Sequence, residues 1–218
     1  MEQQQREENK IAARYYDLPR YERPEGDLDP FAPSGNRRNE IIIGGENNDW
    51  DLYCTGYWRA ADALIRYLTQ VELSARRDYS RYWESMGYAI LFLYRHYLEL
   101  RLKELFIACG GRLEAITSEH SLLRLWGAFL EQYCLLSGKP LEEVSKDKDI
   151  ETAGKIIAQF NEIDEKSQIF RYPIDKRGQV KLQRKRIDMV RLREMLGWTS
   201  QFLDGWSIGL AELRSRHE

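Results

Sequence analysis

This sequence has little cysteine, and it lacks long apolar runs and an excess of one charge. Its three cysteines, Cys54, Cys109 and Cys134, are too few and too widely spaced for a disulfide or zinc framework, which favours a reducing compartment. No apolar run reaches the roughly 18 residues of a membrane span, and the first residues lack the apolar stretch of a secretory signal. We therefore expect a cytoplasmic protein without a membrane partner.

The charge of the chain is nearly balanced. Lysine and arginine number 33 and aspartate and glutamate 35, so the formal net charge is −2, which does not indicate a general nucleic-acid binder. Positive charge gathers only over residues 176–186, where a solvated surface and a contact with a phosphate backbone are alternative interpretations. The candidate residues for binding RNA or DNA are Lys103, Lys181, Arg184, Lys185 and Arg186.

The common motifs of catalysis and cofactor binding are also missing. The sequence has no GxxxxGK[ST] or GxGxxG loop for phosphates, and no GxSxG elbow for a nucleophilic serine. It has no HExxH and no paired CxxC, so a metal site would need ligands from separate elements. We therefore predict no cofactor and no metal.

Prolines divide the chain into two regions. Four of the six prolines lie within residues 1–48, which argues against a packed domain there. We predict an irregular, partly extended N-terminal arm over residues 1–48 and a helical domain over residues 49–218. Within the arm, a short helix over residues 3–16 and a short strand or docked extended piece over residues 40–45 are expected.

From Trp50 onward, apolar residues recur at helical spacing. The hydrophobic fraction of 43% is enough to form a core. The predicted fold class is therefore all-α, a helical bundle of about five helices. The helices are expected at residues 50–74, 80–109, 119–137, 149–164 and 187–213, with a short extended piece near residues 180–182.

The second of these helices carries the most informative pattern. Its N-terminal half is apolar on all sides, which predicts a place in the middle of the bundle. Arg95, His96, Glu99 and Lys103 fall within one arc of about 100°. Aromatic residues continue the same face at both ends, so this polar stripe is expected to be partly shielded from water.

Shielded charges need partners, because an unpaired buried charge is costly. The i,i+4 spacing lets Glu99 pair with both Arg95 and Lys103. Two interpretations stay open: a network that only fixes the helix, and a polar site in a groove where His96 moves protons near neutral pH. Arg101 points the other way and is expected to be an ordinary surface charge.

Two later segments could complete such a site. His120 lies where the third helix begins, and the positive end of a helix favours a neutral imidazole that acts as a base. Arg171 lies between two aromatic residues of a loop and could reach a carboxylate or a phosphate. A half-exposed turn histidine and a packed connector are the alternatives. The candidate catalytic residues are Arg95, His96, Glu99, His120 and Arg171.

Three phrases carry a resemblance to a known family: FLYRHYLELRLK at residues 92–103, EHSLLRLW at 119–126 and SQIFRYP at 167–173. With the bundle layout, they resemble a group of bacterial helical-bundle proteins similar to the HEPN superfamily, over roughly residues 50–213. The resemblance implies a HEPN-like bundle that commonly dimerises. It also implies bacterial antiviral defence, toxin–antitoxin or stress systems, in which many members are metal-independent ribonucleases.

The chain departs from the catalytic pattern of that family, an arginine followed by a histidine after four to six intervening residues. Arg95 and His96 are adjacent, and seven residues separate Arg112 from His120. The family's catalytic roles therefore do not carry over to any pair here.

Two functions stay open after this comparison. The first is a metal-independent endoribonuclease with a non-standard active site. The second is a non-catalytic interaction or sensor subunit of a defence complex, in which the polar stripe is structural. The expected partners are a second copy of the chain, another subunit of a complex, or RNA or DNA.

Overall fold

The computed structural model describes residues 49–70, 79–174, 177–179 and 185–215. All of them belong to the second of the two units into which the chain divides, Asp49–Glu218. The predicted arm, with its helix and strand, and the extended piece near residues 180–182 lie outside the described residues. Two candidate nucleic-acid-binding residues, Lys181 and Arg184, also lie outside them.

The described residues form an all-α bundle, as predicted, and none of them is in a strand. The five long helices lie close to their predicted positions, and two short elements were not expected. The helices are α2 (Trp50–Gln70), α3 (Tyr79–Ala108), α4 (Leu122–Ser137), α5 (Leu141–Val144), α6 (Lys148–Ile163) and α7 (Met189–Ser215), with the 3-10 turn η2 (Leu113–Ala115) before α4.

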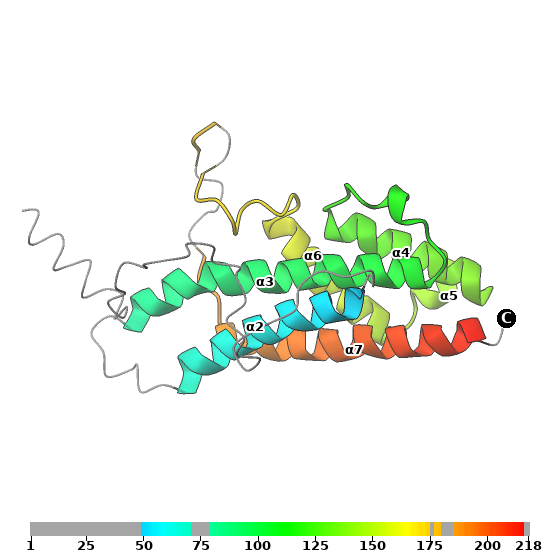
Figure 1. The fold of residues 1–218 in the computed structure, drawn as a ribbon, viewed down its shortest axis with the longest axis horizontal. Helices are drawn as coiled ribbons and strands as arrows, with labels where there is room; N and C mark the ends of the chain where they lie inside the picture. The colour runs from blue at the N-terminus through cyan, green and yellow to red at the C-terminus, as the bar shows by residue number, and fades with distance from the viewer. Residues whose placement is uncertain (1–48, 71–78, 175–176, 180–184, 216–218) are drawn as a thin grey trace, which may run out of the picture. The chain divides into compact units, whose positions relative to one another are not determined.

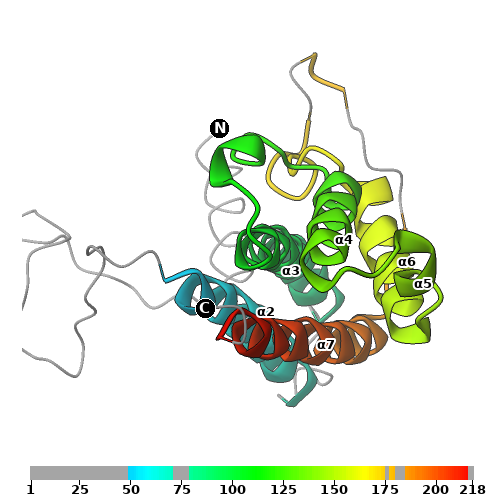
Figure 2. The ribbon, with the colours of Figure 1, turned by 90° about the vertical axis from the view of Figure 1, so that its right-hand side faces the viewer.

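Helix α3 is the central element of this bundle. It contacts α2, α4 and α7, and Figure 2 shows it nearly end-on, with α2 and α7 below it and α4 and α6 to one side. Tyr94, Leu98, Leu102 and Leu105 are fully buried along it, or nearly so, which agrees with its apolar sequence. The segment before α4 and the turn after α6 lie together over a third side of α3 (Figures 1 and 2).

Helix α4 begins at Leu122, three residues later than the periodicity predicts, because side chains bind the free amides before it. The Ser121 hydroxyl accepts a hydrogen bond from the Arg124 amide and caps the helix. The Glu119 carboxylate accepts from the amides of His120 and Ser121, at 2.9 and 2.7 Å. Residues 119–121 therefore form a structured turn that leads into the helix.

Candidate functional site

The guanidinium of Arg95 lies at the centre of the polar stripe and is fully buried, with 0% of the residue exposed. Its Nε donates to the Asp164 carbonyl at 3.0 Å, and one terminal nitrogen donates to Glu99 Oε2 at 3.1 Å. The other terminal nitrogen donates to the carbonyls of His120 and Glu165. Every nitrogen of this buried cation therefore has an acceptor within the protein.

Glu99 is the anion that pairs with Arg95, and it lies one helical turn further along α3. Its Oε2 accepts from Arg95, and its Oε1 accepts from Lys103 Nζ at 3.1 Å and lies 2.9 Å from His120 Nδ1. Lys103 Nζ also donates to the Thr117 carbonyl at 3.3 Å. We call Arg95, Glu99 and Lys103 the buried ladder.

The surroundings of the buried ladder change the pKa values of its charged groups. Burial alone would raise the pKa of Glu99, but the hydrogen bonds from His120 and Lys103 and the charges of Lys103 and Arg95 outweigh it, so the pKa is lowered. Burial lowers the pKa of Arg95, and the negative charge of Glu99 opposes that effect. The carboxylate of Glu99 is therefore held in its charged form.

The ladder joins two turns that are distant in sequence. One is residues 117–120 before α4, and the other is residues 164–167 after α6, where Asp164 Oδ1 accepts from the amides of Gln168 and Ile169. A hydrogen bond of 3.0 Å between Ser121 Oγ and Asn161 Oδ1 connects the same two regions next to the ladder. Because Arg95 binds carbonyls of both turns, it holds them together against α3.

His120 is the member of this network that reaches solvent. Its side chain is 53% exposed, while its Nδ1 lies against the buried carboxylate of Glu99. A carboxylate at one ring nitrogen fixes the orientation of the imidazole and selects its tautomer. The predicted pairing of the later histidine turn with the central helix is therefore present in the structure.

The remaining two candidate residues lie beside the ladder on an aromatic surface. The ring of His96 meets Tyr57 of α2 edge-on, with centroids 4.5 Å apart, and stacks on Phe92 at 5.7 Å. Burial lowers the pKa of His96, and together with the neighbouring cations it outweighs the negative charge of Glu99, which acts in the opposite direction. The exposed guanidinium of Arg171 lies 5.9 Å from the Phe92 ring centroid rather than on Glu99.

The prediction that Arg101 is an ordinary surface charge is wrong. Its side chain is almost fully buried and pairs with Glu104 at 2.7 Å, Asp51 of α2 at 2.9 Å and Asp204 of α7 at 3.0 Å. The periodicity of α3 places Arg101 away from Arg95, but it does not reveal that α2 and α7 cover that side. Ser207 of α7 also donates to Glu104, so this second network joins three helices.

The candidate nucleic-acid-binding residues do not form one surface among the described residues. Lys103 is buried with its ammonium group on Glu99 and Thr117, where it does not reach a phosphate backbone. Lys185 and Arg186 are exposed just before α7 and line a different cavity. The sequence analysis did not identify Asp164 and Asn161 as part of the site. The only feature that distinguishes them in the sequence is their position as polar residues at the end of an amphipathic helix.

Other kinds of site find little support in the described part of the chain. No group of three or more His, Cys, Asp or Glu side chains there is placed to hold a metal ion. No helix of that part is long and apolar enough to cross a membrane. Cys54 is fully buried, and burial raises the pKa of its thiol to about 12, so this residue is not an activated nucleophile.

Comparison with known proteins identifies no relative. No protein-family model, curated protein or solved structure matches the chain.

Arg95→Met should lower the free energy of unfolding by about 3–5 kcal/mol, because it removes the cation from a buried pair and leaves buried acceptors without donors. Urea unfolding at pH 7 measures the effect. Arg124→Met is the matched control, since the Arg124 side chain is 73% exposed and forms only a surface ion pair with Glu119. A loss for Arg95→Met no larger than that of the control would contradict the structural role of the ladder.

The difference in free energy of unfolding between the wild type and Glu99→Gln should become smaller as the pH falls. The folded protein lowers the pKa of Glu99, so its charge contributes stability above the ordinary pKa of about 4.3 and loses that contribution at lower pH. Unfolding curves from about pH 7 to pH 3 test this. Glu151→Gln, at an exposed pair with Lys155, should show no such trend, and a constant gap for Glu99→Gln would overturn the prediction.

Proposed function

We propose that the chain is a non-catalytic interaction subunit of a bacterial defence or stress system, of the HEPN-like class that its sequence resembles. The observation that carries the proposal is the complete burial of Arg95, whose nitrogens all bind acceptors of the protein itself. A cation that stabilises a reacting phosphate must touch the substrate, and this one has neither the exposure nor the spare donors. Arg95 is therefore not available as the phosphate-binding arginine of an arginine–histidine nuclease pair.

In this proposal the ladder works by holding a binding surface in place. The surface consists of His120 on one joined turn and of Arg171 and Tyr172 on the segment after the other, and all three are exposed. Tyrosine and arginine are enriched among the residues that dominate protein–protein binding energy. A rigid support reduces the ordering cost of association, so fixed turns favour tight binding. The partner is a protein, either a second copy of this chain or another subunit of a complex.

One observation favours a second candidate, a metal-independent endoribonuclease. Glu99 Oε1 lies on His120 Nδ1 and leaves the other ring nitrogen, Nε2, for a substrate on the exposed side of the ring. There Nε2 would take the proton from an RNA 2′-hydroxyl as that oxygen attacks the adjacent phosphorus. The bond from phosphorus to the 5′-oxygen breaks, which gives a 2′,3′-cyclic phosphate and a 5′-hydroxyl after protonation. Arg171 would be the exposed cation of this candidate.

An RNA cleavage assay separates the two functions. Purified full-length protein is incubated with a labelled mixture of single-stranded and structured RNAs in the presence of EDTA. The proposal expects RNA to stay intact with the wild type and with His120→Ala, since no positioned cation meets the substrate. Cleavage by the wild type that His120→Ala loses and Lys155→Ala retains would overturn the proposal in favour of the ribonuclease.

The interaction surface predicts a change in assembly without a change in stability. The full-length protein is purified from cells that express it at its natural level. Light scattering after size-exclusion chromatography should then give a mass above the 25.8 kDa of one chain. Tyr172→Ala should weaken that complex and keep the melting temperature, because 60% of Tyr172 is exposed. Lys155→Ala, on exposed α6 surface, is the control. A complex unaffected by Tyr172→Ala would refute this surface, and a wild type that elutes as a single chain would exclude a second copy of the chain as the partner.

A further inference from the structure

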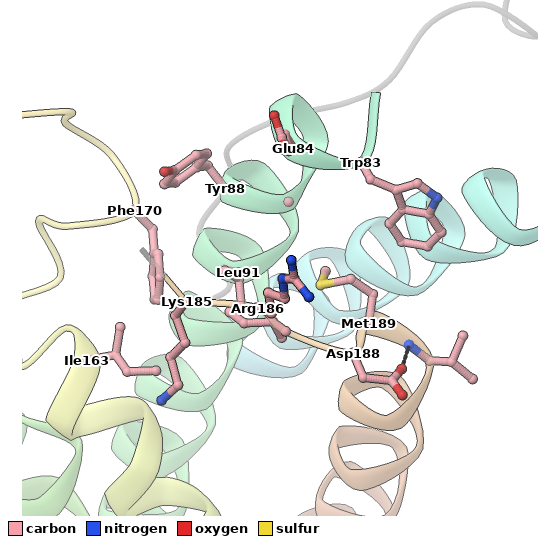
Figure 3. Close-up of a pocket in the computed structure, with 13 residues that line it drawn as sticks. Trp83, Glu84, Tyr88, Leu91, Ile163, Phe170, Lys185, Arg186, Asp188 and Met189 are labelled. Atoms are coloured by element: carbon pink, nitrogen blue, oxygen red, sulfur yellow. Dashed lines mark hydrogen bonds between the residues drawn. The ribbon is translucent and has the colours of Figure 1, made fainter. Parts of the chain in front are cut away.

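A cavity of about 960 Å³ lies away from the buried ladder, where the first half of α3 faces the segment that leads into α7. Figure 3 shows the residues that line it. Its apolar wall comes from α3, from the end of α6 and the turn after it, and from the start of α7, and includes Trp83, Tyr88, Leu91, Phe170 and Met189. The volume is in the range of sites that bind small organic molecules, and such sites are mainly apolar with a few polar groups.

Two cations line the same cavity. Lys185 and Arg186 are exposed in the segment just before α7, and neither forms an ion pair with another described residue. Positive charge beside an apolar wall, without a carboxylate partner among the described residues, suits a molecule with an anionic end and an apolar body.

The two acidic residues at the cavity do not neutralise these cations. Asp188 Oδ1 accepts hydrogen bonds of 3.0 Å from the amides of Val190 and Arg191, and so caps the start of α7. Glu84 lies at the rim, one turn of α3 before Tyr88, and in Figure 3 its carboxylate points away from Lys185 and Arg186. The N-terminus of α7 is likewise occupied by Asp188 and does not supply the anion site.

We propose that this cavity binds an amphipathic organic anion, a fatty-acid-like chain with a carboxylate or phosphate head. Arg186 binds the head, and the side chains of Tyr88, Leu91 and Phe170 cover the chain. In Figure 3 the ammonium group of Lys185 lies toward Ile163, apart from the Arg186 guanidinium, so Lys185 adds positive charge to the cavity without sharing the head. The inference goes beyond the proposed interaction function and does not depend on it, since none of the cavity residues belongs to the ladder or to the surface of His120, Arg171 and Tyr172.

Gly87 provides a way to fill the cavity without unfolding the protein. It lies on the α3 wall, and a Cβ added there would meet no atom within 4 Å. Leucine is also a better helix former than glycine, so Gly87→Leu should keep or raise stability while it occupies the space of the ligand. Gly56 of α2 has the same freedom and lines neither this cavity nor the smaller one between α4 and α7, so Gly56→Leu is the matched control.

Calorimetric titration of the full-length protein with sodium laurate below its micelle concentration tests the proposal. The wild type and Gly56→Leu should bind laurate equally, and Gly87→Leu should lose binding although its melting temperature is not lowered. The double variant Lys185→Gln/Arg186→Gln should bind about tenfold more weakly, because it loses the charge-assisted hydrogen bonds to the head. Dodecyl phosphate in place of laurate shows which head group is preferred, and neutral dodecanol should bind more weakly than either.

Three results would overturn the proposal. In the first, the wild type binds neither laurate nor dodecyl phosphate. In the second, Gly87→Leu binds laurate as tightly as the wild type does. In the third, dodecanol binds the wild type as tightly as laurate does, or the double variant binds laurate as tightly as the wild type does. The experiment also stays separate from the test of the interaction surface. Tyr172→Ala should bind laurate like the wild type, because Tyr172 does not line the cavity.

Discussion

A charged guanidinium in the interior of a helical bundle imposes the strongest constraint on this structure. Removing such a group from water costs several kcal/mol, and only well-placed acceptors compensate for it. Arg95 takes one of these acceptors from its own helix and the others from backbone carbonyls of two separate turns. The position of those turns is therefore a condition for burying the arginine, and the positions of His120 and Asp164 follow from it.

The sequence predicted much of this arrangement, and the part that it missed has a physical explanation. The long helices, the central place of α3 and the pairing of Glu99 with Arg95 and Lys103 follow from apolar periodicity and i,i+4 spacing, and the structure confirms them. The acceptors from the turns were not predictable, because a backbone carbonyl has no side-chain signature. Arg101 was interpreted wrongly for a related reason: helical phase tells which side a residue faces but not which helices cover that side.

The polar residues around the central helix divide into two groups by their access to solvent. Arg95, Glu99 and Lys103 are closed off and support the fold. His120, Arg171 and Tyr172 are exposed on segments that this support holds, which is why an interaction surface is favoured over a catalytic centre. The cavity with Lys185 and Arg186 lies outside both groups. Aromatic residues of α3 and of the turn after α6 line this cavity beside Lys185 and Arg186, although the basic segment has no aromatic residue in its own sequence.

The Arg101 network has a consequence for the central helix as a whole. It ties α3 to α2 and α7 through Asp51 and Asp204, while Arg95 ties the same helix to the two turns on another side. A rotation of α3 by one residue, about 100°, would break both sets of bonds at once. Insertion or deletion of a single residue between positions 95 and 101 would therefore be tolerated far less than substitution, because no neighbouring phase of the helix satisfies both arginines.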